Sequence, residues 1–479
     1  MNKRIHIYSM IAIAMLIASC RVGKEYQRPN PGSDVSFREV NDSLPAQKTA
    51  TVDIAAIPWK VFFTDTTLQH LISQVLDKNY DLATALNNIR KNEEYLKQAK
   101  VEWLPAVTAN VAANTNRFAD NSLNGPRGFN LNNTIGANHI EDYSVSLGVS
   151  WEIDIWGKIK NQKEVALTTW LQSEEAAKSL QTRLISATAA GYYNLLILHE
   201  QLEIAGNNVA LNDTIVSMTQ LQMENGEATI LAVQQAAIQK KKTQSLIPTL
   251  EQAIQIQENA LNILMAHQPQ RIHVNTDIRH FDIPDQFATG IPAELLNRRP
   301  DVRESEYALR AANARIGLAQ ANMYPALSIS AGGGLNAFQA VNWLSLPASL
   351  FGNIAGGVLQ PVFNKRRLKT NLNVTRIEYE QAVTNFKSKF LNAVSEVSDA
   401  LVQSEKLKEK LGITQSQADI LQTAMPNAQL LFTNGMASYL EVIAVEQSLL
   451  QNKLELADLK RQQVTAYIQL YRALGGGTQ

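Results

Sequence analysis

The residue types that carry most enzyme chemistry are few in this chain, and their spacing does not fit a catalytic or metal site. The seven histidines include no pair four residues apart, and His267, His273 and His280 fall in a segment between two predicted helices. The triplet Gly332–Gly334 lacks the lysine of a phosphate-binding loop, so we interpret it as a site of close strand packing. No Gly-x-Ser-x-Gly motif is present. We therefore predict no enzyme activity, no cofactor and no bound metal.

The only cysteine, Cys20, follows a targeting segment. Residues 1–19 combine a basic start with the apolar run Met10–Ala18, which is typical of a signal peptide. The sequence Ile17-Ala18-Ser19-Cys20 is similar to a bacterial lipobox, which predicts that Cys20 is lipid-modified (palmitoylated) and begins the mature chain; Arg21 favours the outer membrane. The alternative is an ordinary signal peptide with an incidental cysteine. With no second cysteine, the exported chain must be stabilised by packing and assembly rather than by disulfides.

Charge and hydropathy narrow the class of protein further. The 479 residues include 44 Lys+Arg and 44 Asp+Glu, so the formal net charge is zero. A nucleic-acid-binding protein usually shows a basic excess, so we predict no nucleic-acid partner. No apolar run reaches the ~18–20 residues of a membrane-spanning helix. A membrane span in this chain would therefore be built from strands.

The segment Tyr143–Lys158 joins a long strand pattern directly to a helical pattern. Its odd positions up to residue 155 are apolar and its even positions are small or polar, so one face of the strand is apolar and the other polar. The predicted strand 143–156 is longer than the ~9–11 residues that cross a bilayer when tilted. We expect the apolar face to contact lipid and the polar face, with Glu152 and Asp154, to line water. The helical pattern begins at Gly157.

The same order of elements occurs twice, which indicates a tandem repeat. The segments Asp81–Pro105 and Asp301–Pro325 have the same length, with Asp81 expected to cap its helix. An N-terminal tether with a short helix occupies 20–80. Repeat 1, residues 81–291, is predicted to contain helices 81–104, 157–224 and 229–266 and strands 105–117 and 143–156. Repeat 2, residues 292–479, is predicted to contain helices 300–323, 366–432 and 438–474 and strands 325–336 and 351–363.

Four strands are too few to close a barrel in lipid, where open edges cannot persist and known barrels have at least 8 strands. The chain must therefore oligomerise. All strand–helix junctions fall at one end of the hairpins and carry aromatic residues, as expected for an interfacial girdle. These residues are Trp103, Trp151, Trp156, Tyr324 and Phe363. One alternative is that they only fill space between helices; another is a lipid-anchored coiled coil without a pore, against which the strand alternation argues.

Six motifs carry a family resemblance. They are Ser150-Trp-Glu-Ile-Asp-Ile-Trp-Gly157-Lys, Arg298-Arg-Pro-Asp301-Val-Arg303, Ala314-Arg-Ile-Gly317-Leu-Ala-Gln-Ala321, Tyr324-Pro325, Tyr439-Leu-Glu441-Val and Tyr471-Arg-Ala-Leu-Gly475. They resemble the outer-membrane efflux factor family (TolC-like, lipoprotein OprM/NodT-type branch). The resemblance implies an α+β membrane protein, a homotrimer in which three copies of four strands make a 12-stranded transmembrane β-barrel continuous with a 12-helix periplasmic α-barrel. It also implies location in the bacterial outer membrane, with the lipid anchor at Cys20.

The resemblance further implies a function and partners. The expected function is that of the passive exit channel of a tripartite efflux pump for small toxic compounds, with a periplasmic adaptor protein and an inner-membrane RND transporter as partners. The alternative is the outer-membrane channel of a type I protein secretion system, a class that commonly lacks a lipobox.

The turns between the long helices and their return helices are the expected docking sites for the adaptor. They contain Asn225-Gly226 and Asn434-Gly435, where glycine suits the end of a helix. Glu441 matches the family's acidic residue at the periplasmic aperture, where threefold repetition would make a charged ring. The alternative is a solvated glutamate favoured by the helix dipole. A second acid one turn later is absent, because that position is Ala444.

Overall fold

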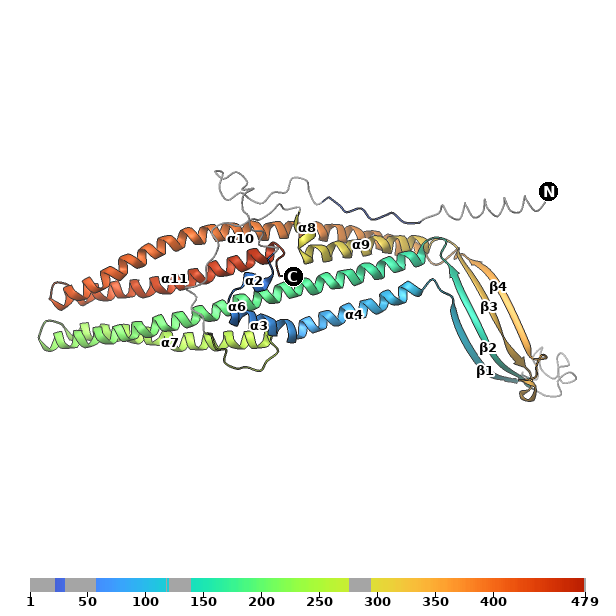
Figure 1. Ribbon diagram of the computed structural model, residues 1–479, viewed down its shortest axis with the longest axis horizontal. Coiled ribbons are helices and arrows are strands. Elements are labelled where there is room, and N and C mark those ends of the chain that lie inside the picture. Colours follow the sequence, from blue (N-terminus) through green and yellow to red (C-terminus); the bar gives the residue numbers. More distant parts are fainter. Residues whose placement is uncertain (1–21, 31–56, 118, 120–138, 275–293, 478–479) are drawn as a thin grey trace. The chain divides into compact units, whose positions relative to one another are not determined.

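A computed structural model describes residues 22–30, 57–117, 119, 139–274 and 294–477 (Figure 1). The predicted signal peptide and Cys20 lie outside the described residues, as does most of the segment between the first two strands. No helix in these ranges is both long enough and apolar enough to cross a membrane. The chain divides into two compact units. Unit 1 comprises 1–28, 90–171 and 307–384, and unit 2 comprises 29–89, 172–306 and 385–479.

The two repeats contain helices of equal length. In repeat 1 the elements are α4 (Tyr80–Val101), β1 (Ala106–Arg117), β2 (His139–Ile153), α6 (Lys158–Glu224) and α7 (Ile230–Leu264). In repeat 2 they are α9 (Pro300–Ala321), β3 (Ala326–Ala337), β4 (Leu350–Leu359), α10 (Arg367–Thr433) and α11 (Tyr439–Ala473). The shorter elements are α2 (Trp59–Phe62), α3 (Thr66–Lys78), α8 (Leu295–Arg298) and the 3₁₀ helix η4 (Ala340–Asn342). Helices α6 and α10 each have 67 residues, and α7 and α11 each have 35.

Unit 1 holds a four-stranded antiparallel sheet in the order β1-β2-β3-β4 (Figure 1). The register pairs Leu147 with Ala109 and Gly333, and it pairs Ser146 with Gly334. The alternation of side chains is therefore in phase across the strands, which gives the sheet one mostly apolar and one mostly polar face. At the loop end the apolar face becomes polar, with Glu141 accepting a hydrogen bond from the hydroxyl of Tyr143 at 3.1 Å. Neighbouring strands approach so closely at Gly334 that a Cβ atom there would clash with the backbone oxygen of Val145. Glycine is thus needed for packing at this point.

Four predicted bounds are wrong. Strand β2 begins at His139 rather than at 143, because it pairs with β1 as far as Arg117. Helix α4 ends at Val101 rather than at 104. The other two are strand ends, each with a local reason. Strand β2 ends at Ile153 rather than at 156, because the carboxylate of Asp154 turns to cap α6. Its oxygens accept hydrogen bonds from the backbone N–H groups of residues 159 and 160, both at 3.0 Å. Strand β4 ends at Leu359 rather than at 363. Pro361 lacks the N–H group that would continue the ladder.

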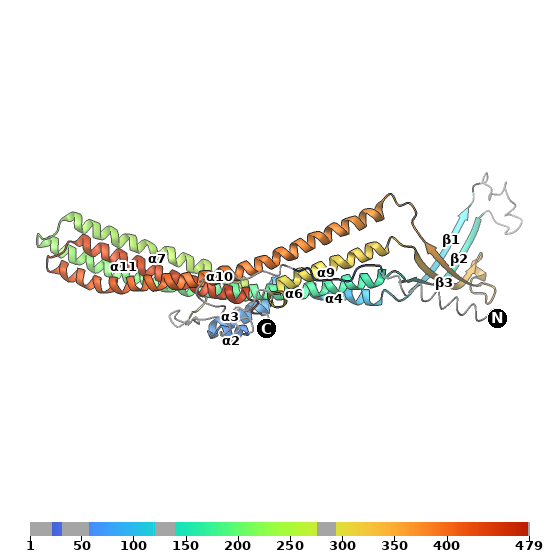
Figure 2. The same ribbon diagram turned by 90° about the horizontal axis from the view of Figure 1, so that it is seen from above.

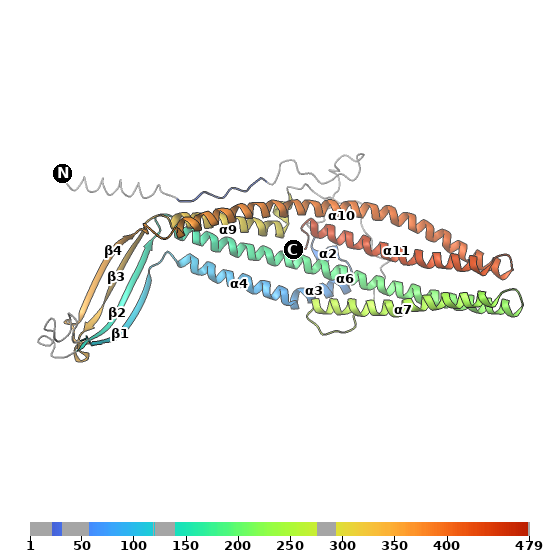
Figure 3. The same ribbon diagram turned by 180° about the vertical axis from the view of Figure 1, so that it is seen from behind.

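Unit 2 is helical. Helix α7 runs back along α6, and α11 runs back along α10 (Figures 1 and 3). Seen at right angles, the halves of these helices nearest the turns gather into one bundle (Figure 2). Its core includes buried side chains from all four helices. These are Ile215, Ala236, Met425, Phe432, Val442, Ile443 and Leu449.

Candidate functional site

The strand–helix junctions in unit 1 bring four of the five predicted girdle residues into two pairs. The indole Nε1 of Trp151 donates a hydrogen bond to the backbone oxygen of Trp103 at 2.9 Å. Trp156 stacks on Tyr324 with ring centroids 4.7 Å apart, and its Nε1 donates to the oxygen of Pro325 at 2.8 Å. Each pair therefore joins two consecutive strands where they meet the helices.

The fifth residue predicted for the girdle, Phe363, is 86% exposed and lies beyond the end of β4. Trp156 also lies outside its predicted strand, in the link between β2 and α6. This link is short: Gly157 supplies a left-handed bend (φ +75°), and Lys158 forms an ion pair with Glu152 at 2.8 Å. In repeat 2 the corresponding bend falls on Lys365 and Arg366, two non-glycine residues with positive φ.

The two turns that join the long helices to their return helices have the same backbone geometry. Gly226 has φ +80° and Gly435 has φ +71°. Their N–H groups donate to the carbonyl groups three residues earlier, both at 3.0 Å. The turns lie close together, since Gln222 Nε2 donates to the oxygen of Phe432 at 2.9 Å. Both glycines are structurally required, because side chains disfavour this left-handed conformation.

The second turn carries Glu441 in the first turn of α11. The carboxylate accepts hydrogen bonds from the backbone N–H (2.6 Å) and the hydroxyl (3.2 Å) of Ser438, the residue that caps the helix. Glutamate at this position completes a capping box. The side chain of Glu441 is therefore exposed to solvent but held at the start of α11. At the same position of α7, 209 residues earlier, the chain has Ala232 instead.

Behind this turn lies a buried polar network that the sequence pattern alone does not reveal. Glu446 on α11 is 0% exposed, and its two carboxylate oxygens accept hydrogen bonds from Asn212 on α6 (3.0 Å) and Gln239 on α7 (3.2 Å). Burial raises the pKa of Glu446 above its ordinary value, and the amide hydrogen bonds only partly oppose this. One feature of the sequence does indicate its burial: Glu446 lies on the same helical face as the apolar residues Val442 and Leu449, which are buried.

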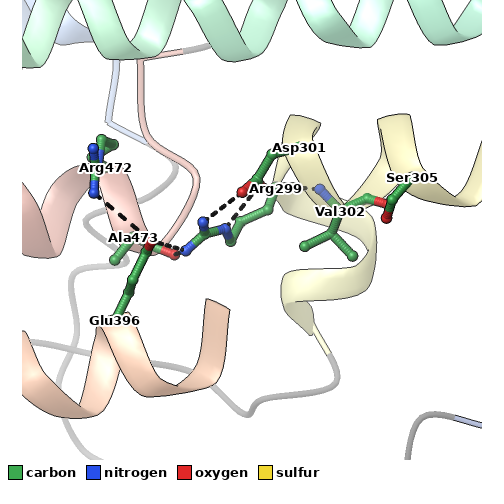
Figure 4. Close-up of polar contacts among 7 residues, drawn as sticks. All are labelled: Arg299, Asp301, Val302, Ser305, Glu396, Arg472 and Ala473. Carbon is green, nitrogen blue, oxygen red and sulfur yellow. Dashed lines mark hydrogen bonds and ion pairs between the residues drawn. The ribbon is translucent and has the colours of Figure 1, made fainter. Parts of the chain in front are cut away.

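Arg299 and Asp301 of the Arg-Arg-Pro-Asp motif form a second polar cluster in unit 2 (Figure 4). Arg299, just before α9, is 6% exposed and forms two hydrogen bonds with Asp301 (3.0 and 2.7 Å). It also forms an ion pair with Glu396 on α10 (2.8 Å) and donates to the backbone oxygen of Ala473 on α11 (3.1 Å). Burial raises the pKa of Asp301, but the hydrogen bonds and charge of Arg299 outweigh it and hold this pKa below its ordinary value. One arginine thus connects three helices.

The two polar clusters are built from contacts between helices. Within the described ranges, no three His, Cys, Asp or Glu side chains come together in a way that could hold a metal ion. The polar groups of both clusters are instead hydrogen-bonded or ion-paired to one another across helices. Their geometry fits the positioning of long helices.

Comparison with known proteins gives a consistent match along the chain. The family model described as outer membrane efflux protein matches residues 71–267 and 291–476. The chain is 29% identical to the cation efflux system protein CusC of Escherichia coli O6:H1, with 98% of each chain covered. It is 26% identical to the probable outer membrane lipoprotein SilC of Salmonella typhimurium, with 99% of each covered. A crystal structure of CusC superposes with a TM-score of 0.80 at 28% identity, covering 95% of this chain and 100% of that one.

Proposed function

The chain belongs to the outer membrane efflux protein family, and from this premise we propose that it forms the exit channel of a tripartite efflux pump. In this function, three copies assemble in the bacterial outer membrane and conduct small toxic compounds to the exterior without an energy source of their own. The lipid on Cys20 anchors each copy.

The observation that carries this proposal is the sheet of unit 1. Within one chain, β1 and β4 are paired on one side only, and in lipid such edges must be paired. Strands β1 and β4 run in opposite directions, so β4 of one copy can pair with β1 of the next in the same antiparallel manner as the strands within a chain. Three copies of four strands then close a 12-stranded barrel whose apolar face contacts lipid and whose polar face lines water.

The ends of the long helices supply the contacts for the partners. Leu221 and Leu231 flank the turn of repeat 1, and Leu430 and Leu440 flank the turn of repeat 2; all four are between 57% and 63% exposed. Exposed apolar side chains on paired helices suit helix-in-groove recognition. The partner at this surface is a helical hairpin of a periplasmic adaptor protein, which connects the channel to an inner-membrane RND transporter.

Glu441 is the aperture residue in this proposal. Repeated by the threefold axis, it places three carboxylates in one ring, and such rings favour cations. The capping box supports this role, because it holds each carboxylate at a defined position at the helix start.

Single-channel recording in planar bilayers tests two claims: that the protein is a channel, and that Glu441 lies at its aperture. The full-length wild-type trimer should conduct with a preference for cations. Glu441→Gln keeps a capping acceptor but removes the charge, so cation preference should fall by about fivefold, the weight of one unit-charge contact at ~4 Å in water. Glu441→Ala removes the charge and the side chain that completes the capping box with Ser438, so its cation preference should fall by the same factor. The matched control is Glu227→Gln, which removes an exposed acid from the other turn and should change nothing.

The outcomes separate the two claims. A wild-type trimer without conductance would contradict the channel function itself. Conductance with an unchanged cation preference in Glu441→Gln would leave the channel in place and remove Glu441 from the aperture.

A further inference from the structure

The loop between β3 and β4 is unusual for a segment at the end of a sheet, because it exposes large apolar side chains. Val341 is 92% exposed, Leu344 is 74% exposed and Leu346 is 70% exposed. The segment Phe338–Ser349 contains no charged residue. Exposed apolar patches of this kind mark contact with a partner or with a membrane.

The loop is held in shape by its own hydrogen bonds. Ser349 donates from its hydroxyl to the backbone oxygen of Asn342 (2.7 Å) and from its N–H group to the oxygen of Ser345 (2.9 Å). Asn342 donates from its side chain to that of Gln339 (3.1 Å). The apolar side chains are thus presented outward by a braced segment that includes the 3₁₀ helix η4.

The position of the loop shows which face of the sheet it continues. Trp343, at the end of η4, contacts the ring of Tyr143, with centroids 5.7 Å apart. Tyr143 is paired with Ala337 and lies in phase with Leu147, so its side chain projects from the apolar face. The loop therefore folds toward the apolar face rather than toward the polar one. Leu350, the next residue on that face, is 64% exposed.

From this continuity we propose that the loop Phe338–Ser349 rests in the outer leaflet of the membrane, with Val341, Leu344 and Leu346 in contact with lipid. The occupant of this surface is membrane lipid, because the apolar face that it extends is the lipid-facing wall of the barrel. The Tyr143–Trp343 pair lies at the opposite end of the sheet from the Trp103–Trp151 and Trp156–Tyr324 pairs. Aromatic residues concentrate at both interfaces of a membrane, and this pair supplies the second belt.

The inference can be tested with an environment-sensitive fluorophore in lipid nanodiscs. Full-length trimers carrying the Leu344→Cys or Val341→Cys substitution are labelled with a nitrobenzoxadiazole group and exposed to doxyl-labelled phospholipids or to aqueous iodide. Two substitutions on β2 calibrate the measurement: Leu147→Cys on the apolar face and Ser146→Cys on the polar face. Variants are compared only as intact trimers.

We expect both loop sites to show blue-shifted emission and to lose intensity with doxyl lipid, as Leu147→Cys does, and to resist iodide. Quenching by iodide as at Ser146→Cys would overturn the inference, because the loop would then lie in water. Resistance to both quenchers would also overturn it, because the three loops would then pack against one another or against another part of the protein. If Leu147→Cys is itself not reached by doxyl lipid, the barrel assignment under the proposed function fails as well.

Discussion

In each repeat a side chain donates a hydrogen bond to the last residue of the return helix, but the donor is neutral in repeat 1 and charged in repeat 2. In repeat 1, the side chain of Asn79 donates to the backbone oxygen of Leu264, the last residue of α7, at 2.9 Å. In repeat 2, 220 residues later, Arg299 donates to the oxygen of Ala473, the last residue of α11, at 3.1 Å. The two residues precede the equivalent helices α4 and α9. Both repeats therefore have a hydrogen bond to the last residue of the return helix, but a different residue type donates it in each.

The difference lies in what each donor does with its other atoms. Asn79 is neutral, and its side-chain oxygen accepts from the N–H groups of residues 81 and 82, both at 3.0 Å. Asn79, and not the predicted Asp81, thus caps α4. Arg299 is buried and charged, and it pairs with the partly exposed carboxylates of Asp301 and Glu396, so it also links α10. A neutral donor can sit alone in the interior, whereas a charged one requires partners.

The largest expected effect comes from removing these donors. Arg299→Met leaves Asp301 without its cation and leaves Glu396 with only Arg472, 3.8 Å away. Because both carboxylates are partly exposed, the substitution should cost about 3 kcal/mol per chain, the low end of the range for a broken buried pair. Asn79→Ala removes a cap and one hydrogen bond and should cost only about 1–2 kcal/mol. Thermal and urea unfolding of purified trimers, followed by circular dichroism, would rank the two.

A second substitution separates charge from packing. Asp301→Asn added to Arg299→Met should recover part of the loss, because it removes one uncompensated charge. If Asn79→Ala and Arg299→Met lowered the free energy of unfolding equally, the charge of Arg299 would not make its contact more important than that of neutral Asn79.

The two turns should respond alike, since they share one backbone geometry. No atom lies within 4 Å of a Cβ built on Gly226 or Gly435, so a substitution there meets only backbone strain. Gly226→Ala and Gly435→Ala should each cost about 1–2 kcal/mol, the penalty of the left-handed conformation. Asparagine, which tolerates this conformation, should cost less at both sites. Clearly unequal losses, measured by the same unfolding experiment, would show that the turns are not equivalent.

The smallest expected effect is a pH dependence of stability caused by Glu446, which only repeat 2 contains. The position equivalent to Glu446 in repeat 1 is Ala237. Because burial raises the pKa of Glu446, its contribution to stability is present at low pH and is lost as pH rises through the pKa of the folded state. Glu446→Gln should therefore stabilise the trimer more at pH 8 than at pH 5. Melting temperatures of the two proteins across this range provide the measurement, and a constant difference would argue against titration of Glu446.

Features set by neighbouring residues could be predicted from the sequence, and those set by distant contacts could not. The alternation in β2 and the glycines of the turns are local signals, and both lie where the sequence placed them. The partners of Glu446 are 207 and 234 residues away, and Arg299 meets its acceptor 174 residues away. The end of β2 was missed for another reason: Asp154 fits the strand pattern but makes a better helix cap.

The equal lengths of the paired helices constrain how such a chain can change over evolution. Every boundary of α6 and α7 recurs 209 residues later in α10 and α11. An insertion of about seven residues in α6 alone would move its turn by about 10 Å relative to the turn of α10. Contacts between the turns, such as that from Gln222 to Phe432, would then be broken. Insertions and deletions in relatives of this chain should therefore come as matched pairs, one in each repeat, so that the length of the helical hairpins is inherited as a single trait.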